Sequence, residues 1–150
     1  MILSGQSIRK RCIITPFHER TRQLGMTYGL GPAGYDVRIA EEIVIPRGGA
    51  RLASTLEHFD MPNDLLARVA DKSTWARRFV AVQNTIIEPG WRGYLTLEIS
   101  NHSDSHVRIV EGSPIAQIIF DLLDEPAERP YDGKYQDQPR GAVAAIHEEA

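Results

Sequence analysis

The chain has 150 residues, 42% of them apolar and 25% charged, a composition that fits one soluble domain with a single core. Its formal net charge of −3 gives no support for a nucleic-acid or membrane surface, and we expect neither partner. Its single cysteine excludes an intramolecular disulfide and a cysteine-rich zinc site.

Taken in chain order, the sequence begins with residues 1–11, which lack the long apolar run of a signal peptide. No later stretch approaches the roughly 18 apolar residues of a membrane span, so we expect a cytoplasmic protein. Residues 4–11 predict one short helix that starts at Ser4. Residues 16–34, rich in glycine, proline and charge, predict a loop.

Short segments rich in β-forming residues follow, separated by clusters of glycine, proline, asparagine and aspartate. They are residues 37–45, 51–57, 65–70, 80–82, 94–100, 107–110 and 115–122. Many short strands at this spacing predict an all-β sandwich or barrel. Residues 72–78 predict one or two helical turns between strands, and residues 124–150 predict a tail that is mobile unless something orders it.

One predicted strand has a glutamate in its middle. Residues 93–101 alternate between apolar and polar side chains, so Thr96, Glu98 and Ser100 share one face. Glutamate is a poor strand former, and two interpretations of Glu98 stay open. It is either a solvated residue or a carboxylate that faces a pocket, where burial would raise its pKa and make it a general base.

The predicted helical turn offers two cations and two hydroxyls within residues 72–77 (KSTWAR). On a helix Ser73 and Arg77 share a face, and backbone N–H groups at a helix start attract phosphate oxygens. With Lys72 they would form a small polyphosphate cradle. The alternative is an exposed turn with a Ser/Thr cap; the pattern of a P-loop is missing.

The tail combines aromatic residues, amides and one lysine, which favours a flap that orders over a ligand, with a disordered C-terminus as the alternative. Other chemistries fail on the residues themselves. The zinc deaminase signature needs two cysteines in P-C-x-x-C. The five histidines form no H-E-x-x-H, and Ser73 lacks the G-x-S-x-G of an acyl-transfer nucleophile.

Several blocks together resemble the dCTP deaminase branch of the dUTPase superfamily. The blocks are residues 34–38 (GYDVR), 72–77 (KSTWAR), 85–101 (TIIEPGWRGYLTLEISN), 115–120 (IAQIIF) and 133–138 (GKYQDQ). They occur in family order and span nearly the whole chain, so the combination is specific although each block alone is weak. The dUTPase branch usually has an apolar residue where Glu98 stands.

The resemblance implies an all-β fold, a distorted β-barrel or jelly-roll of the dUTPase-like type with one or two short helices. It implies one domain over residues 1–150, with about 124–150 as a flexible C-terminal flap, and a homotrimer with active sites at the subunit interfaces. The implied reaction is deamination of dCTP to dUTP and ammonia, which feeds dUMP and dTTP synthesis.

The resemblance also implies residue roles. Glu98 would deprotonate the water that attacks C4 of cytosine, without zinc, and Ser73 and Arg77 would lie close to this chemistry. Mg²⁺ would be bound through the triphosphate oxygens of the nucleotide rather than by a protein cage. The substrate-binding residues implied are Lys72, Ser73, Thr74, Trp75, Ala76, Arg77, Glu88, Thr96, Leu97, Gln117, Tyr131, Lys134 and Gln138.

The sequence departs from the family pattern in three places, and two further functions remain open as alternatives. Asp71 stands where relatives usually have glycine, and Ile86 stands where one subgroup has proline. The stretch between Arg38 and Leu65 is shorter than in most family members. An acid beside the cradle would repel a triphosphate, which leaves room for a monophosphate, a modified base or a different nucleotide as the substrate. If Glu88 orients a water against phosphorus, the protein is a dUTP diphosphatase or a bifunctional enzyme that forms dUMP from dCTP. The remaining alternative is a non-catalytic nucleotide-binding regulatory trimer.

Overall fold

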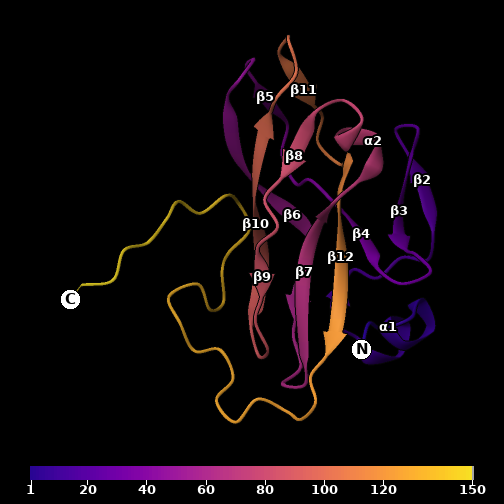
Figure 1. Ribbon diagram of the computed structural model, residues 1–150, viewed down its shortest axis with the longest axis vertical. Helices are drawn as coiled ribbons and strands as arrows, with labels where there is room; N and C mark the ends of the chain where they lie inside the picture. Colours follow the sequence, from indigo (N-terminus) through magenta and orange to yellow (C-terminus); the bar gives the residue numbers. More distant parts are fainter. Residues whose placement is uncertain (150) are drawn as a thin grey trace.

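Two antiparallel sheets make up most of the chain in the computed structural model, which describes residues 1–149 (Figure 1). The larger sheet has six strands in the spatial order β2 (Thr21–Gln23), β3 (Met26–Leu30), β4 (Tyr35–Arg38), β12 (Pro114–Leu122), β7 (Leu65–Asp71) and β9 (Ile86–Ile87). The smaller sheet has four, in the order β1 (Ile14–Thr15), β6 (Ala50–Asp60), β10 (Arg92–Asn101) and β8 (Val80–Val82). A ribbon of β5 (Ile43–Ile45) with β11 (Val107–Ile109) lies at one end.

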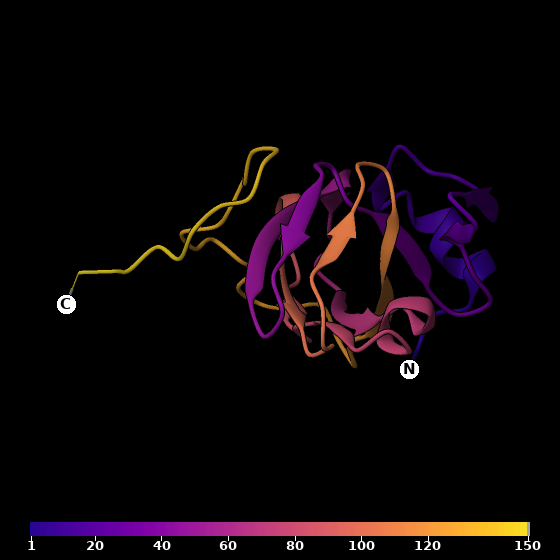
Figure 2. The ribbon, with the colours of Figure 1, turned by 90° about the horizontal axis from the view of Figure 1, so that it is seen from above.

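The two sheets curl around one hydrophobic core, as the view from above shows (Figure 2). Tyr35 and Phe120 of the larger sheet are fully buried, and so are Phe59 and Leu97 of the smaller one. Burying each such side chain contributes roughly 1.5–3 kcal/mol, so the sheets are held together mainly by this shared core. The predicted all-β fold with short helices is therefore confirmed.

Two short helices lie outside the sheets, α1 (Gly5–Arg11) and α2 (Ser73–Ala76). Ser4 is the N-cap residue of α1, as its sequence predicts. The single turn of α2 follows directly on β7 and is anchored by Trp75, which is 4% exposed and donates its indole Nε1–H to the carbonyl of Pro114 at 2.8 Å. The predicted helical segment 72–78 is thus confirmed as a single turn.

Two predicted segments differ from the structure. Residues 16–34 were predicted as a loop, but they contain the hairpin of β2 and β3, which closes through Leu24 and Gly25 with φ of 53° and 74°. Gly25 readily adopts the positive φ of such a tight turn, whereas a leucine such as Leu24 is uncommon there. The sequence of the turn therefore did not predict a hairpin. The predicted strand 37–45 is interrupted, because β4 ends at Arg38 and β5 begins at Ile43.

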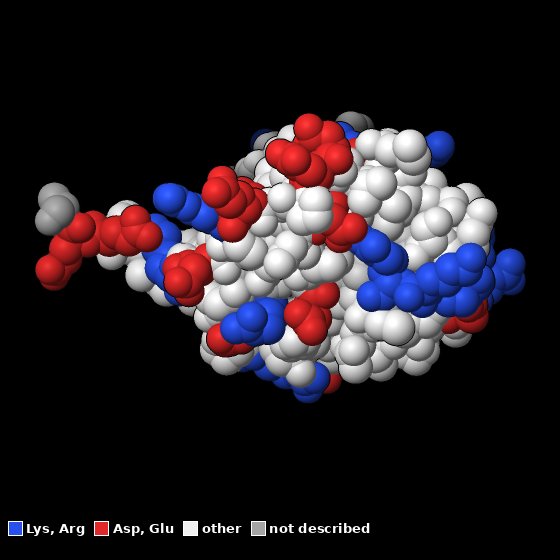
Figure 3. Space-filling model, turned by 90° about the horizontal axis from the view of Figure 1, so that it is seen from below, with Lys and Arg blue, Asp and Glu red and all other residues white. Residues whose placement is uncertain are grey.

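The surface mixes charges of both signs. Seen from below, Lys and Arg gather on the side away from the tail, while acidic side chains lie nearer the tail and at its end (Figure 3). Several of the charges are paired, as in Arg9–Glu19 at 2.5 Å and Arg68–Asp121 at 2.8 Å. None of the helices in residues 1–149 is long and apolar enough to span a membrane.

Candidate functional site

Glu98 lies on β10 and faces a cavity of about 400 Å³. The alternation of β10 sends Leu97 and Ile99 into the core, where they are 1% and 0% exposed, and leaves Glu98 on the other face. A bulge between Tyr94 and Thr96 turns Leu95 and Thr96 toward the same cavity. The rest of the lining is Leu52, Thr85, Ile86, Ile87, Glu88, Trp91, Tyr131, Tyr135, Gln138, Val143 and Ala145.

The carboxylate of Glu98 is the polar group that its surroundings leave unsatisfied. Within residues 1–149, its Oε2 is the one buried side-chain nitrogen or oxygen without a hydrogen-bond partner. Burial among apolar side chains raises the pKa of Glu98 above its usual value, and its own backbone N–H opposes this shift only in part. A carboxylate with a raised pKa and a free oxygen is suited to accept a proton from a water or a substrate. The pocket-facing interpretation of Glu98 therefore fits the structure.

Four further residues named from the sequence share this cavity with Glu98. They are Glu88, Thr96, Tyr131 and Gln138. Glu88 is in the turn before β10, and Gln138 is in the C-terminal segment, so the cavity joins parts of the chain that are far apart in sequence. Leu97 was expected beside the base, but its side chain is in the core and does not line the cavity.

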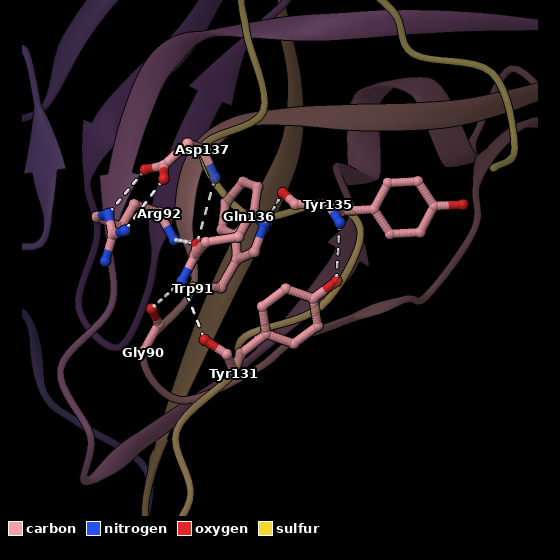
Figure 4. Close-up of polar contacts among 7 residues, drawn as sticks. All are labelled: Gly90, Trp91, Arg92, Tyr131, Tyr135, Gln136 and Asp137. Atoms are coloured by element: carbon pink, nitrogen blue, oxygen red, sulfur yellow. Dashed lines mark hydrogen bonds and ion pairs between the residues drawn. The ribbon is translucent and has the colours of Figure 1, made fainter. Parts of the chain in front are cut away.

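The C-terminal segment 131–138 is fastened to the turn between β9 and β10 (Figure 4). The side-chain amide of Gln136 donates to the carbonyls of Gly90 and Tyr131 at 2.9 and 3.0 Å and accepts from the backbone N–H of Arg92 at 2.8 Å. Arg92 also pairs with Asp137 at 2.8 Å. These contacts hold residues 131–138 in place as a wall of the cavity. The segment after Gln138 makes fewer hydrogen bonds to the rest of the protein than residues 131–138 do.

Sequence reasoning missed Gln136 and Trp91 as organisers of the site. Trp91 lines the cavity and donates its indole N–H to the carbonyl of Tyr135 at 2.7 Å. The amide and aromatic residues of the tail were the available signal in the sequence. We interpreted them as contacts to a ligand, whereas Gln136 and Trp91 make contacts between the tail and the rest of the protein.

The predicted phosphate cradle forms a second group on α2. Ser73 and Arg77 are exposed, whereas Lys72 is 8% exposed and its Nζ pairs with Asp36 Oδ2 at 2.7 Å. Gln117 of β12 lies opposite Asp36 in the register of β12 and β4, so it belongs to the same end of the sheet. The cation of Lys72 is therefore partly neutralised within the chain.

The structure does not bring this second group into the cavity of Glu98. The residues named from the sequence that do not line that cavity are Lys72, Ser73, Thr74, Trp75, Ala76, Arg77, Leu97, Gln117 and Lys134. The helix α2 and the strand β9, which contributes Ile86 and Ile87 to the cavity, lie toward different ends of the molecule (Figure 1). A single chain thus holds two separate half-sites, one acidic and apolar and one basic.

Asp71, at the end of β7, has a local structural role. Its Oδ1 accepts the backbone N–H of Val82 at 2.7 Å and so ties β7 to β8. Ile86 is 45% exposed and contributes an apolar wall to the cavity. Two of the three departures from the family pattern, Asp71 and Ile86, therefore lie next to the two half-sites.

The protein offers no metal cage of its own among the residues that the structure describes, since no group of three or more His, Cys, Asp or Glu side chains in 1–149 is placed to hold an ion. The exposed Ser73 and Arg77 of the α2 segment instead carry a hydroxyl and a guanidinium, groups of the kind that bind phosphate oxygens.

Known proteins match this chain over most of its length. Residues 35–123 match the family described as dCTP deaminase-like. A dCTP deaminase from Thermococcus sibiricus is 35% identical over 151 residues, which cover 91% of this chain and 92% of the relative.

Two solved structures show the same fold. The 2′-deoxycytidine 5′-triphosphate deaminase from Agrobacterium tumefaciens has a TM-score of 0.65 at 19% identity, over 81% of this chain and 47% of that chain. The EIAV dUTPase has a TM-score of 0.60 at 20% identity, over 81% of this chain and 97% of that chain. Because both a deaminase and a dUTPase share it, the fold alone does not choose between the two reactions.

Proposed function

This chain belongs to the dCTP deaminase-like family, and on that premise we propose that it deaminates dCTP to dUTP and ammonia. The observation that carries the proposal is the carboxylate of Glu98, which faces the cavity with a buried, unpartnered Oε2 and a raised pKa. A nucleotide-binding protein without catalysis would have no use for an unsatisfied carboxylate, which is costly to keep buried.

In the proposed reaction Glu98 takes a proton from water, and the resulting hydroxide adds to C4 of the cytosine. The C4 carbon then carries both the new oxygen and the amino group. Addition breaks the C4–N3 double bond, and the carboxyl group of Glu98 gives its proton to N3. The carboxylate then takes the proton of the new C4 hydroxyl and passes it to the amino group. The C4–NH₂ bond breaks as C4=O forms, so ammonia leaves and the uracil base remains with a proton on N3. A base whose pKa is raised toward the working pH is effective in both directions of this proton transfer.

The nucleotide phosphates are assigned to Lys72, Ser73 and Arg77, with magnesium on the phosphate oxygens. Since these residues do not reach the cavity of their own chain, we infer that a neighbouring copy supplies them. A closed ring of three copies would put the α2 cradle of one subunit against the Glu98 cavity of the next, as the family resemblance implies. Both half-sites would then be complete at each interface.

A second candidate activity rests on Glu88, which lines the same cavity as Glu98. If it orients a water against phosphorus, the enzyme also cleaves the product dUTP to dUMP. The likeness of the fold to a dUTPase is compatible with either role.

The test is to incubate the protein with dCTP and Mg²⁺, resolve the nucleotides by chromatography and assay ammonia. Ammonia with dUTP supports the deaminase, and ammonia with dUMP supports the bifunctional enzyme. Cleavage of dUTP without any action on dCTP would contradict the role of Glu98. Glu98→Gln is the matched control, because it keeps the size of the side chain and removes the base.

A further inference from the structure

Phe79, between α2 and β8, holds a large apolar ring in solvent. It is 66% exposed, and its φ of 60° lies in the left-handed region that bulky residues rarely adopt. Two hydrogen bonds fix the backbone in this conformation. Its N–H donates to the carbonyl of Ala76 at 3.0 Å, and its carbonyl accepts the N–H of His102 at 2.8 Å. In the single chain both the exposure of the ring and the strain of the backbone cost free energy.

The ring lies on the same exposed segment as the arginine assigned to the nucleotide phosphates. Arg77 and Arg78 precede Phe79 directly, and both are exposed. The guanidinium of Arg78 lies 4.8 Å from the centre of the Trp75 ring, which anchors α2 to the body of the protein. Arginine and aromatic residues are the types most enriched where protein surfaces bind one another. The segment 77–79 therefore has the composition of a protein interface as well as that of a phosphate site.

The cavity of Glu98 presents a surface of the complementary kind. Leu52 and Ile86 line it and are 40% and 45% exposed, so two apolar side chains at its mouth face solvent. Glu88, which is also exposed, and Glu98 add two carboxylates to the same lining. One half-site thus offers an apolar mouth with acidic groups, and the other offers an aromatic ring with arginines.

We propose that Phe79 is the anchor between copies of this chain, with its ring packed on Leu52 and Ile86 of the next copy. The inference rests on the shared site of the proposed function, in which Arg77 of one copy reaches the Glu98 cavity of the next. Two residues of chain span at most about 7 Å, so the ring then lies at the mouth of that cavity. There it covers the apolar side chains that the single chain exposes and excludes water from the cavity.

The fixed backbone of Phe79 suits this role. A side chain that is presented on a rigid backbone loses little freedom when it binds. Glycine at this position would relieve the strain of the left-handed φ and would remove the ring. The residue therefore costs the single chain free energy and favours association, and a substitution by glycine separates these two effects.

The test measures association without nucleotide, by analytical ultracentrifugation from nanomolar to micromolar protein. We expect Phe79→Gly to raise the dissociation constant at least about tenfold, because an aromatic anchor is lost. The variant should still fold, as circular dichroism would show, since glycine adopts this φ without strain. Phe79→Tyr keeps the ring and should associate like the wild type.

Leu24→Gly is the matched control. Leu24 is 55% exposed and has a φ of 53°, so the change removes an exposed apolar side chain and a left-handed strain from the β2–β3 hairpin. Its association should not change. Leu52→Ala should weaken association, with little further loss when it is combined with Phe79→Gly, because both remove the same contact. Additive losses would place the ring elsewhere and overturn the proposal, as would a wild type that stays a single chain or a Phe79→Gly protein that associates as tightly as the wild type.

Ammonia release from dCTP is assayed on the same proteins. The activity per chain of Phe79→Gly should fall on dilution and recover at high protein concentration, as expected for a site that association completes. A wild-type protein that associates through Phe79 but releases no ammonia contradicts the proposed function alone. Ammonia release together with unchanged association of Phe79→Gly contradicts the anchor alone.

Discussion

The indole Nε1 of Trp91 donates a hydrogen bond to the carbonyl of Tyr135 at 2.7 Å, and this bond joins a residue that lines the cavity to the C-terminal segment. The segment is therefore part of the wall of the cavity. Closure over a ligand, as the sequence predicts, has to come from the residues beyond Gln138, of which Val143 and Ala145 already line the cavity.

Trp91→Phe is expected to loosen the C-terminal segment. The ring remains, but one hydrogen bond worth about 1 kcal/mol is lost, so amide exchange in residues 131–138 should become faster by roughly 2- to 10-fold. Hydrogen exchange with mass spectrometry measures the change. Trp75→Phe is the matched control, because it removes an indole hydrogen bond to Pro114 instead. Equal acceleration by both variants would show that the Trp91 bond is not what holds the segment.

Glu98→Gln is expected to abolish turnover and at the same time to stabilise the protein at neutral pH. Burial raises the folded-state pKa of Glu98, so the folded protein favours the neutral carboxyl. This preference adds to the free energy of unfolding. The added amount has its full size below the pKa of Glu98 in the unfolded chain, about 4.3, and is lost as the pH rises through the higher pKa of the folded protein. Glutamine is neutral at every pH, so the variant should melt higher than the wild type at pH 8 and alike at pH 4. A lower melting temperature at pH 8 would contradict the buried, unpaired carboxylate.

The rate of deamination should depend on the same ionisation. Glu98 acts as a base only when it is charged, so kcat/KM should fall on the acid side with an apparent pKa above the ordinary value of about 4.3. A pH profile of kcat/KM between 4.5 and 8.5, measured at dCTP concentrations well below KM, reports the ionisation of the free enzyme and so measures this limb. An acid limb at an ordinary glutamate pKa would mean that substrate binding or another group controls the rate.

The ion pair of Arg38 and Glu57 is expected to stabilise the fold rather than the chemistry. Glu57 is fully buried and accepts hydrogen bonds from both the backbone N–H and the guanidinium of Arg38, at 3.0 and 2.9 Å. Arg38→Leu leaves this carboxylate without its partner and should lower the free energy of unfolding by about 3–5 kcal/mol. Urea denaturation measures the loss. Arg9→Leu, which breaks an exposed pair with Glu19, should cost less than about 1 kcal/mol.

The placement of Glu98 was visible in the sequence because it depends on local periodicity, whereas the other cavity residues named from the sequence came from the family resemblance. The alternation of residues 93–101 placed Glu98 opposite Leu97, and the structure has the same arrangement. The same alternation should have assigned Leu97 to the core; the family resemblance put it in the pocket instead. The contacts of Gln136 with Gly90 and Arg92 span 46 and 44 residues, and no local pattern predicts them. The hairpin at Leu24 and Gly25 was missed because its turn lacks the residues that usually mark one.

The separation of the two half-sites leads to the most direct test of assembly. If Glu98 of one subunit works with Arg77 of its neighbour, Glu98→Gln and Arg77→Ala protein should each be inactive alone. Mixed subunits then form some interfaces in which Glu98 and Arg77 are both intact. In closed rings formed from equal amounts of the two variants, an interface has an intact Glu98 with a probability of one half and an intact Arg77 with a probability of one half. About a quarter of the interfaces, and so about a quarter of wild-type activity, should therefore be restored.

The two variants are mixed in urea, refolded together and assayed for ammonia, with each refolded alone as the control. Size-exclusion chromatography with light scattering gives the number of subunits in the active fraction. If activity does not return although the mixed oligomer forms, Glu98 and Arg77 of the same chain must meet, since then every chain carries one inactive half. That result would require α2 to move toward β10 within one subunit and would contradict the shared site.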